Sequence, residues 1–200
     1  MRKQFSGQYG DIISLENLLA AWQDFVRGKR GKRDVAEFGL NLTDNIVQLH
    51  EELANQTYRH GGYKSFYITD PKPRHIHKAS VRDRVLHHAI YRVLYPFFDG
   101  TFIADSFSCR LQKGTHKALN RLRAITYKVS RNNTKACWIL KCDIEKFFAS
   151  IDHQILLNIL ANYISDQNII WLLEKVVESF STHPPLPTPI QGGKSSFVPP

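Results

Sequence analysis

The sequence has few cysteines, no long apolar run and no signal peptide, and each absence excludes a class of protein. Its three cysteines are odd in number and lack CxxC spacing, which argues against a disulfide framework or a cysteine zinc site and indicates a reduced, cytoplasmic protein. No apolar stretch approaches the roughly 20 residues that a membrane span requires, and no apolar segment follows the basic N-terminus. The 200 residues therefore predict a globular protein of one domain or two small ones, without a membrane partner.

Acidic residues are missing from one long part of the chain. Between Arg110 and Lys141 there are nine Lys and Arg residues and no Asp or Glu, and between Arg59 and Arg84 there are seven against two. These windows together carry +14 while the whole chain carries +9, so the remainder is net acidic. Solvated helix faces explain any single surface cation, but two concentrated windows indicate a polyanionic partner, most simply nucleic acid.

Hydrophobic periodicity predicts a helix-rich α+β protein. On the helix expected over 114–131, Lys117, Arg121 and Lys128 fall near the same side. The end of the chain is rich in Pro, Gly and Ser and is expected to be irregular. The expected elements are helices over 14–31, 34–58, 80–98, 114–131, 154–163 and 166–180, a hairpin over 65–79 and a strand over 138–143.

Asp143 is the acid that most needs an explanation, because it follows the apolar run ACWIL (Ala136–Leu140) of the expected strand. An ionised carboxylate in dry surroundings costs several kcal/mol unless a partner compensates it. A strand end is a usual place for a magnesium ligand, since Mg²⁺ takes oxygen ligands. A helix-capping or salt-bridged acid is equally consistent with the pattern. A magnesium nuclease would need Asp143, Glu145 and Asp152 to converge, which their places on a strand end and separate helical turns disfavour.

Two further patterns suggest chemistry but fail on spacing. His75 and His77 share a strand face and His87 and His88 follow on a helix, yet no Cys, Asp or Glu completes a recognised zinc spacing. Surface or phosphate-facing histidines are the favoured interpretation. The GGKSS stretch suggests a phosphate loop, but Thr188 stands where a Walker motif needs glycine.

Three sequence blocks, in this order and spacing, resemble the first conserved blocks of bacterial reverse transcriptases. They are "KPRHIHKASVRDRVLHHAIYRVL", "FIADSFSCRLQKGTHKAL" and "WILKCDIEKFFASIDH". Among these enzymes, those of group II introns, retrons and diversity-generating retroelements have the most similar blocks. The resemblance covers about residues 63–180. It implies the fingers and partial palm of a right-hand polymerase. The implied parts are an N-terminal helical extension over 1–62, fingers over 63–135, the first part of the palm over 136–182 and an irregular tail over 183–200.

The resemblance also implies a role for each matching residue. Asp143 matches the first catalytic aspartate, beside which two Mg²⁺ ions act on the primer 3′-hydroxyl and the leaving pyrophosphate. The Ile144 carbonyl matches a backbone oxygen that helps to hold one ion, and Phe148 matches the aromatic gate against the ribose 2′-hydroxyl. Lys72, Arg74 and Arg110 match cations that grip the triphosphate of the incoming dNTP. The acid-free window, rather than the resemblance, predicts that Lys113, Lys117, Arg121 and Lys128 bind nucleic acid.

The sequence departs from the family after residue 180. "LPTPIQGGKSSFVPP" fits the G-x-P-x-G block poorly, and no Tyr-x-Asp-Asp motif or thumb follows. One carboxylate does not hold two Mg²⁺ ions in productive geometry, so the chain is expected to be an incomplete, inactive portion of an RNA-directed DNA polymerase.

The expected partners follow from the same resemblance. They are an RNA template, a DNA or RNA primer, dNTP, and a structured element RNA or an accessory protein. The alternative is a non-catalytic basic module that binds RNA. A downstream Asp-Asp hairpin in the reading frame would favour the enzyme.

Overall fold

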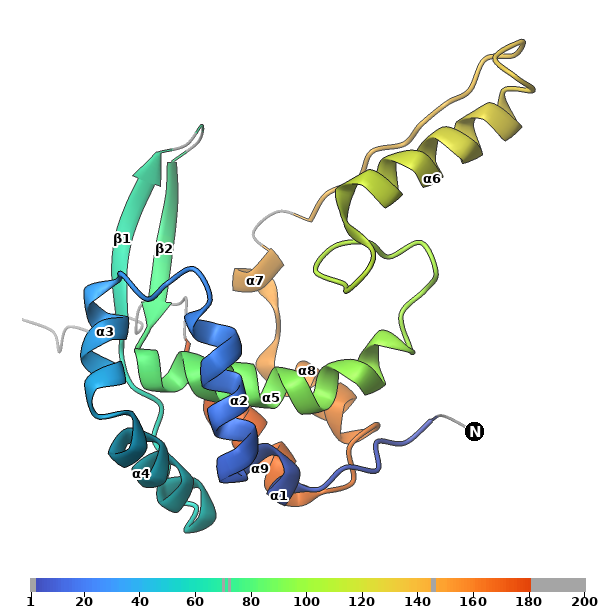
Figure 1. Ribbon diagram of the computed structural model, residues 1–200. Coiled ribbons are helices and arrows are strands. Elements are labelled where there is room, and N and C mark those ends of the chain that lie inside the picture. Colours follow the sequence, from blue (N-terminus) through green and yellow to red (C-terminus); the bar gives the residue numbers. More distant parts are fainter. Residues whose placement is uncertain (1–2, 70, 72, 145–146, 181–200) are drawn as a thin grey trace, which may run out of the picture.

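The computed structural model describes residues 3–180 except 70, 72, 145 and 146. It is a helix-rich α+β structure, as the sequence predicts, in which a helical body carries two projections (Figure 1). In this described part of the chain, no helix combines the length and apolarity needed to cross a bilayer. The body contains α1 (Tyr9–Ile13), α2 (Leu15–Val26), α3 (Arg33–Leu40), α4 (Leu42–Ala54), α5 (Val81–Asp99), α8 (His153–Ala161) and α9 (Gln167–Glu178). The projections are the antiparallel hairpin of β1 (Tyr63–Thr69) and β2 (Pro73–Ala79), and an arm built on α6 (Gly114–Val129), with the short α7 (Phe147–Ser150) after the arm.

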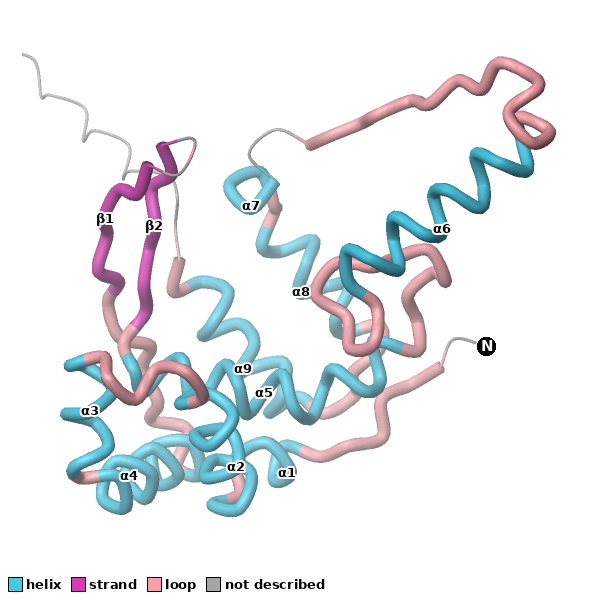
Figure 2. Tube along the Cα trace, turned by 45° about the horizontal axis from the view of Figure 1, so that its top comes forward, coloured by secondary structure: helices cyan, strands magenta, loops and turns pink. Residues whose placement is uncertain are grey.

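Helix α5 is the centre of the body. It begins where the Ser80 hydroxyl caps it by accepting a hydrogen bond from the Asp83 amide at 3.2 Å. Its apolar face packs against α2 (Figure 2), and burial of each large apolar side chain contributes about 1.5–3 kcal/mol. The central residues of this contact are Leu18, Ala21 and Phe25 of α2 and Val85, Leu86 and Ala89 of α5, all nearly or fully buried.

The N-terminal segment is tied to the C-terminal helices. The Phe5 amide donates to the Tyr163 carbonyl at 2.8 Å in a single parallel bridge. The Asp166 carboxylate accepts a hydrogen bond from the Tyr9 amide at 2.7 Å and also caps α9. Ile169 and Leu172 of α9 are fully buried. Residues at both ends of the described chain thus belong to one core.

The helix expected over 34–58 is divided in two, and that prediction was wrong in its continuity. The chain leaves the helical conformation at Asn41, between α3 and α4. The Asn45 side-chain amide donates to the Phe38 carbonyl at 2.9 Å and so satisfies the end of α3. The Phe38 ring packs against Trp22 at 5.3 Å between centroids. The bend lets each short helix turn its own apolar side toward the body, which a single straight helix does not do.

The strand predicted over 138–143 does not form, and the prediction was wrong. Residues 135–144 run back along α6 without a paired strand (Figure 2), and Trp138 is 95% exposed and Leu140 87%. A strand needs a neighbour to take its backbone hydrogen bonds. Among the described residues the paired strands are β1 and β2, which bond to each other. The apolar run therefore has neither a sheet nor a core to enter.

Candidate functional site

Asp143 lies in the extended segment between α6 and α7, exposed to solvent. One carboxylate oxygen, Oδ1, accepts a hydrogen bond from the Ile144 amide at 3.0 Å. The Ile144 side chain is itself 64% exposed. The burial expected for a carboxylate at the end of an apolar strand is therefore absent. A metal ion or nucleic acid would have free access to this side chain.

Two of the residues implied by the resemblance fall outside the description. Lys72 lies at an undescribed position of the hairpin turn, and the side chain of Phe148 is not described although its backbone belongs to α7. Their predicted contacts with the incoming nucleotide stay predictions.

Arg74 lies on β2 near the tip of the hairpin, opposite Ile68 of β1. Its side chain is exposed and forms no ion pair with any residue that the structure describes. A guanidinium that is held on a strand without an ion-pair partner among the described residues is suited to an anion such as phosphate.

Arg110 is engaged with the protein rather than free. Its side chain is only 9% exposed, and Nε donates to Asp99 Oδ1 at 2.7 Å. The two terminal nitrogens donate to the carbonyls of Asp99, Ile103 and Ser106 at 2.9–3.2 Å. Hydrogen bonds from Arg110 and then Tyr95 hold the pKa of the Asp99 carboxyl below its usual value. Arg110 thus organises the loop between α5 and α6, and contact with a triphosphate would require it to exchange some of these partners.

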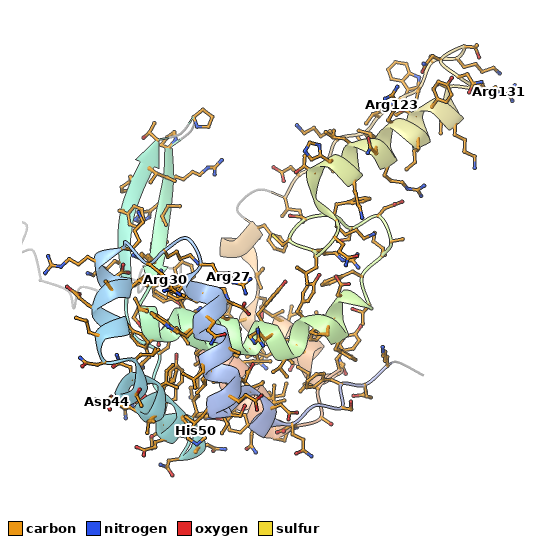
Figure 3. All side chains as sticks on the ribbon, viewed as in Figure 1. Arg27, Arg30, Asp44, His50, Arg123 and Arg131 are labelled. Atoms are coloured by element: carbon orange, nitrogen blue, oxygen red, sulfur yellow. The ribbon has the colours of Figure 1, made fainter. Side chains whose placement is uncertain are left out.

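The cations of the α6 arm differ in the partners that they have. Arg121 binds Asp105 through two hydrogen bonds of 2.7 and 3.1 Å, and Lys113 donates to the Ala104 carbonyl at 2.7 Å. Lys117 and Lys128 are exposed and form no ion pair with another described residue. Figure 3 adds Arg123 and Arg131, which lie on the outer half of the arm. Since α6 buries none of its residues, its cations are presented to solvent on a projecting support.

A three-carboxylate nuclease site has no support in the structure. The Asp152 carboxylate caps α8, because its Oδ1 accepts from the Ile155 amide at 2.9 Å. Glu145 lies outside the described residues. Across the described ranges, no three His, Cys, Asp or Glu side chains gather closely enough to hold a metal ion.

Comparison with known sequences identifies the family. A sequence model described as "Reverse transcriptase (RNA-dependent DNA polymerase)" matches residues 68–193. This range covers more than half of the chain and includes Arg74, Arg110 and Asp143. The chain belongs to the reverse transcriptase family. The resemblance of the three sequence blocks is thereby confirmed at the level of the family.

Two curated relatives of this reverse transcriptase family chain are distant and much longer. Protein YkfC of Escherichia coli (strain K12) is 23% identical over 140 residues, which cover 69% of this chain and 36% of YkfC. Nuclear intron maturase 1, mitochondrial, of Arabidopsis thaliana is 25% identical over 93 residues, 46% of this chain and 12% of the maturase. The chain thus aligns with about a third of one relative and an eighth of the other.

Sequence reasoning missed one cationic segment of this reverse transcriptase family chain. The segment 27–33, which is the connection after α2 together with the first residue of α3, holds five cations in seven residues and no acid. These five cations are visible in the sequence. They were overlooked because all residues outside 59–84 and 110–141 were taken together, and that sum is net negative. Figure 3 shows Arg27 and Arg30 at the end of α2 that points toward the hairpin, with Asp44 and His50 on the far side of the body.

Sequence reasoning also missed the buried acid at the base of the hairpin. Asp83 is fully buried and accepts hydrogen bonds from the Tyr58 hydroxyl at 2.9 Å, the Gly61 amide at 3.0 Å and the Ser80 hydroxyl at 2.6 Å. A Cβ atom at Gly61 would lie 2.7 Å from Asp83 Oδ2, so the close approach requires glycine. The Ser-x-x-Asp spacing at the start of α5 was the available signal. Asp83 fixes the link between α4 and the hairpin against α5.

A pair of partly buried histidines beside Asp83 should make stability depend on pH. His87 Nε2 lies 3.2 Å from His60 Nε2, and burial first, then the neighbouring His60, lowers the pKa of His87 to about 4. Between about pH 6.5, the ordinary pKa of a histidine, and about pH 4, the folded state binds fewer protons at His87 than the unfolded state does. The contribution of His87 to stability is therefore complete above about pH 6.5 and is lost as the pH falls toward 4. At about 1.4 kcal/mol per pKa unit, we expect His87 to account for a loss of roughly 3 kcal/mol.

Urea unfolding of the wild type and His87→Gln between pH 7 and 4 measures this contribution. The Gln side chain still donates toward His60 but does not titrate, so the difference between the two curves isolates His87 from the carboxylates. Parallel curves would contradict the assignment.

Proposed function

We propose that this chain supplies the fingers and the first catalytic aspartate of an RNA-directed DNA polymerase that transfers nucleotides to a primer 3′-end. The observation that carries the proposal is the family match over residues 68–193, which includes Asp143 in an exposed segment. The proposed parts are an N-terminal extension over 1–62, fingers over 63–135 and the start of the palm over 136–182. The hairpin and the α6 arm both belong to the proposed fingers.

The metal of the proposed reaction is Mg²⁺, and the donors available suit it in kind. The Asp143 carboxylate and the Ile144 carbonyl are hard oxygen ligands of the sort that Mg²⁺ takes. Bound there, Mg²⁺ would supply activation of the primer 3′-hydroxyl and charge stabilisation for the leaving pyrophosphate. A single carboxylate does not complete a site for two ions, and the sequence has no Tyr-x-Asp-Asp motif. We therefore propose that these 200 residues alone do not extend a primer.

The incoming dNTP is proposed to meet the hairpin and the loop after α5. Arg74 has no ion-pair partner among the described residues and is proposed to bind phosphate oxygens together with Lys72, which stands two positions earlier in the sequence. Arg110 would join them by exchanging carbonyl partners for phosphate, while its hydrogen bond to Asp99 keeps the guanidinium oriented. Phe148 is proposed as the gate against the ribose 2′-hydroxyl.

The template and primer are proposed to run along the cations of the arm, Lys113, Lys117, Arg121 and Lys128. A structured element RNA or an accessory protein is a further proposed partner. A non-catalytic basic RNA-binding module is the second candidate, favoured by an α6 that buries none of its residues. Both candidates bind RNA, and primer extension separates them.

Binding of RNA is expected to depend steeply on salt. Each phosphate neutralised by a Lys or Arg releases counterions, so the logarithm of affinity falls with the logarithm of salt by about 0.7–0.9 per contact. In the double variant Lys117→Ala/Lys128→Ala, the plot of log affinity against log salt should therefore be shallower by roughly 1.5. The control Lys3→Ala/Lys175→Ala removes the same charge outside the arm and should leave the slope nearly unchanged. Fluorescence anisotropy titrations at three salt concentrations measure the slopes, and equal slopes for the two variants would contradict arm binding.

A further inference from the structure

One face of the hairpin carries a continuous series of ring contacts. Tyr67 of β1 and His75 of β2 are register partners whose rings stack nearly parallel, 9° apart with centroids at 4.4 Å. His75 contacts His77 at 4.2 Å. Side chains two residues apart on a strand lie on the same face. We call the surface formed by Tyr67, His75 and His77 the ring face.

The ring face is anchored at its base and open near its tip. His77 contacts Phe180 at 5.0 Å, and Phe180 contacts Tyr63 at 5.2 Å. The Tyr63 hydroxyl lies 2.9 Å from the Ser179 hydroxyl at the end of α9. Toward the tip, Tyr67 remains 74% exposed although it stacks on His75. The rings are therefore held in place by the body while the outer side of the stack stays accessible.

The charge of the hairpin does not repel a polyanion from the ring face. The two strands carry Lys64, Arg74 and Lys78 and no Asp or Glu among their residues. These three cations alternate along the strands with the ring-face residues and so lie on the opposite face, and Lys78 pairs with Asp34 at 2.6 Å. Exposed rings stack on unpaired bases of single-stranded nucleic acid, so stacking is the contact that the ring face itself offers.

We propose that the ring face binds unpaired bases of single-stranded RNA, with Tyr67 as the outermost stacking partner. The inference rests on the proposed function, since it assigns a place on the hairpin to an RNA strand. Stacking tolerates any base, so the ring face distinguishes unpaired from paired RNA rather than one sequence from another. Cross-strand ring pairs also stabilise a hairpin, but that role would leave RNA affinity untouched.

The opposite face of the same hairpin provides a matched control. Phe66 of β1 pairs with Ile76 of β2, and its ring is 44% exposed. Phe66→Ala therefore removes an exposed ring of similar size from the same strand. Tyr67→Phe removes the hydroxyl and keeps the ring.

The experiment measures binding of three RNA ligands of equal length at one salt concentration by anisotropy. They are a single-stranded homopolymer, a blunt duplex, and a strand of abasic residues that keeps the phosphates. We expect Tyr67→Ala to bind the single strand about tenfold more weakly, and the duplex and the abasic strand as the wild type does. Tyr67→Phe and Phe66→Ala should match the wild type on all three ligands.

The outcomes separate this inference from the proposed function. If Tyr67→Ala and Phe66→Ala weaken single-strand binding equally, or if Tyr67→Ala weakens duplex binding as much, the ring face is not a base platform. If the wild type binds single and abasic strands alike, the phosphates alone are recognised and the inference fails while RNA binding stands. A wild type that binds none of the three ligands overturns both proposals.

Discussion

Replacing Asp143 by Asn is expected to lower primer extension by a hundredfold to a thousandfold in a chain that continues through the Asp-Asp hairpin and thumb of the family. Asn keeps the size of the side chain but removes the charge that holds Mg²⁺, and loss of such charge stabilisation at a transferring phosphoryl group costs 10²–10³ or more. Extension of a labelled primer on an RNA template measures the effect. Binding of template and primer should change little, since the arm carries most of the cations.

The same substitution should leave the fold intact. Asp143 is exposed, and its carboxylate accepts a hydrogen bond from the amide of the next residue, Ile144. We therefore expect the free energy of unfolding of the 200-residue chain to change by less than about 0.5 kcal/mol, as for other surface substitutions. A variant that extends a primer at the normal rate would refute the metal assignment. A loss of several kcal/mol in stability would instead favour a structural role for this acid.

Replacing Asp83 by Ala is expected to destabilise the protein by about 3–5 kcal/mol, the range found when one partner of a buried ionic network is removed. The substitution removes a fully buried acceptor from the Tyr58 hydroxyl, the Gly61 amide and the Ser80 hydroxyl, and Tyr58 itself is buried. It also removes a carboxylate that lies 3.6 Å from the Arg82 guanidinium. Urea unfolding followed by circular dichroism measures the change.

Two controls show whether the buried network is the cause. Asp44→Ala removes an exposed acid from the first turn of α4 (Figure 3) and should cost no more than about 1 kcal/mol through the helix dipole. Asp83→Asn keeps one acceptor oxygen and should fall between Asp83→Ala and the wild type. An Asp83→Ala variant as stable as Asp44→Ala would mean that the base of the hairpin contributes little to the fold.

The sequence by itself determined the elements whose signals are local. The apolar spacing over 80–98 predicted α5, the alternation around a Pro-containing turn predicted the hairpin, and periodic apolar residues predicted α8 and α9. Three ordered blocks identified the family. Each of these signals lies within a few residues of what it specifies, because caps, turns and apolar periodicity act along the chain.

Tertiary structure alone decided what depends on a distant partner. The apolar run before Asp143 reads as a strand, but without a neighbouring strand its backbone has no hydrogen-bond partners in a sheet, and the acid stands in solvent. Arg110 reads as a free cation, yet Asp99 and the carbonyls of its own loop take its donors. Neither Asp83 nor Tyr67 was singled out in the sequence, since one is defined by groups from three segments and the other by a cross-strand stack. A contact between residues far apart in the chain leaves no periodic trace, so its geometry is fixed only when the chain folds.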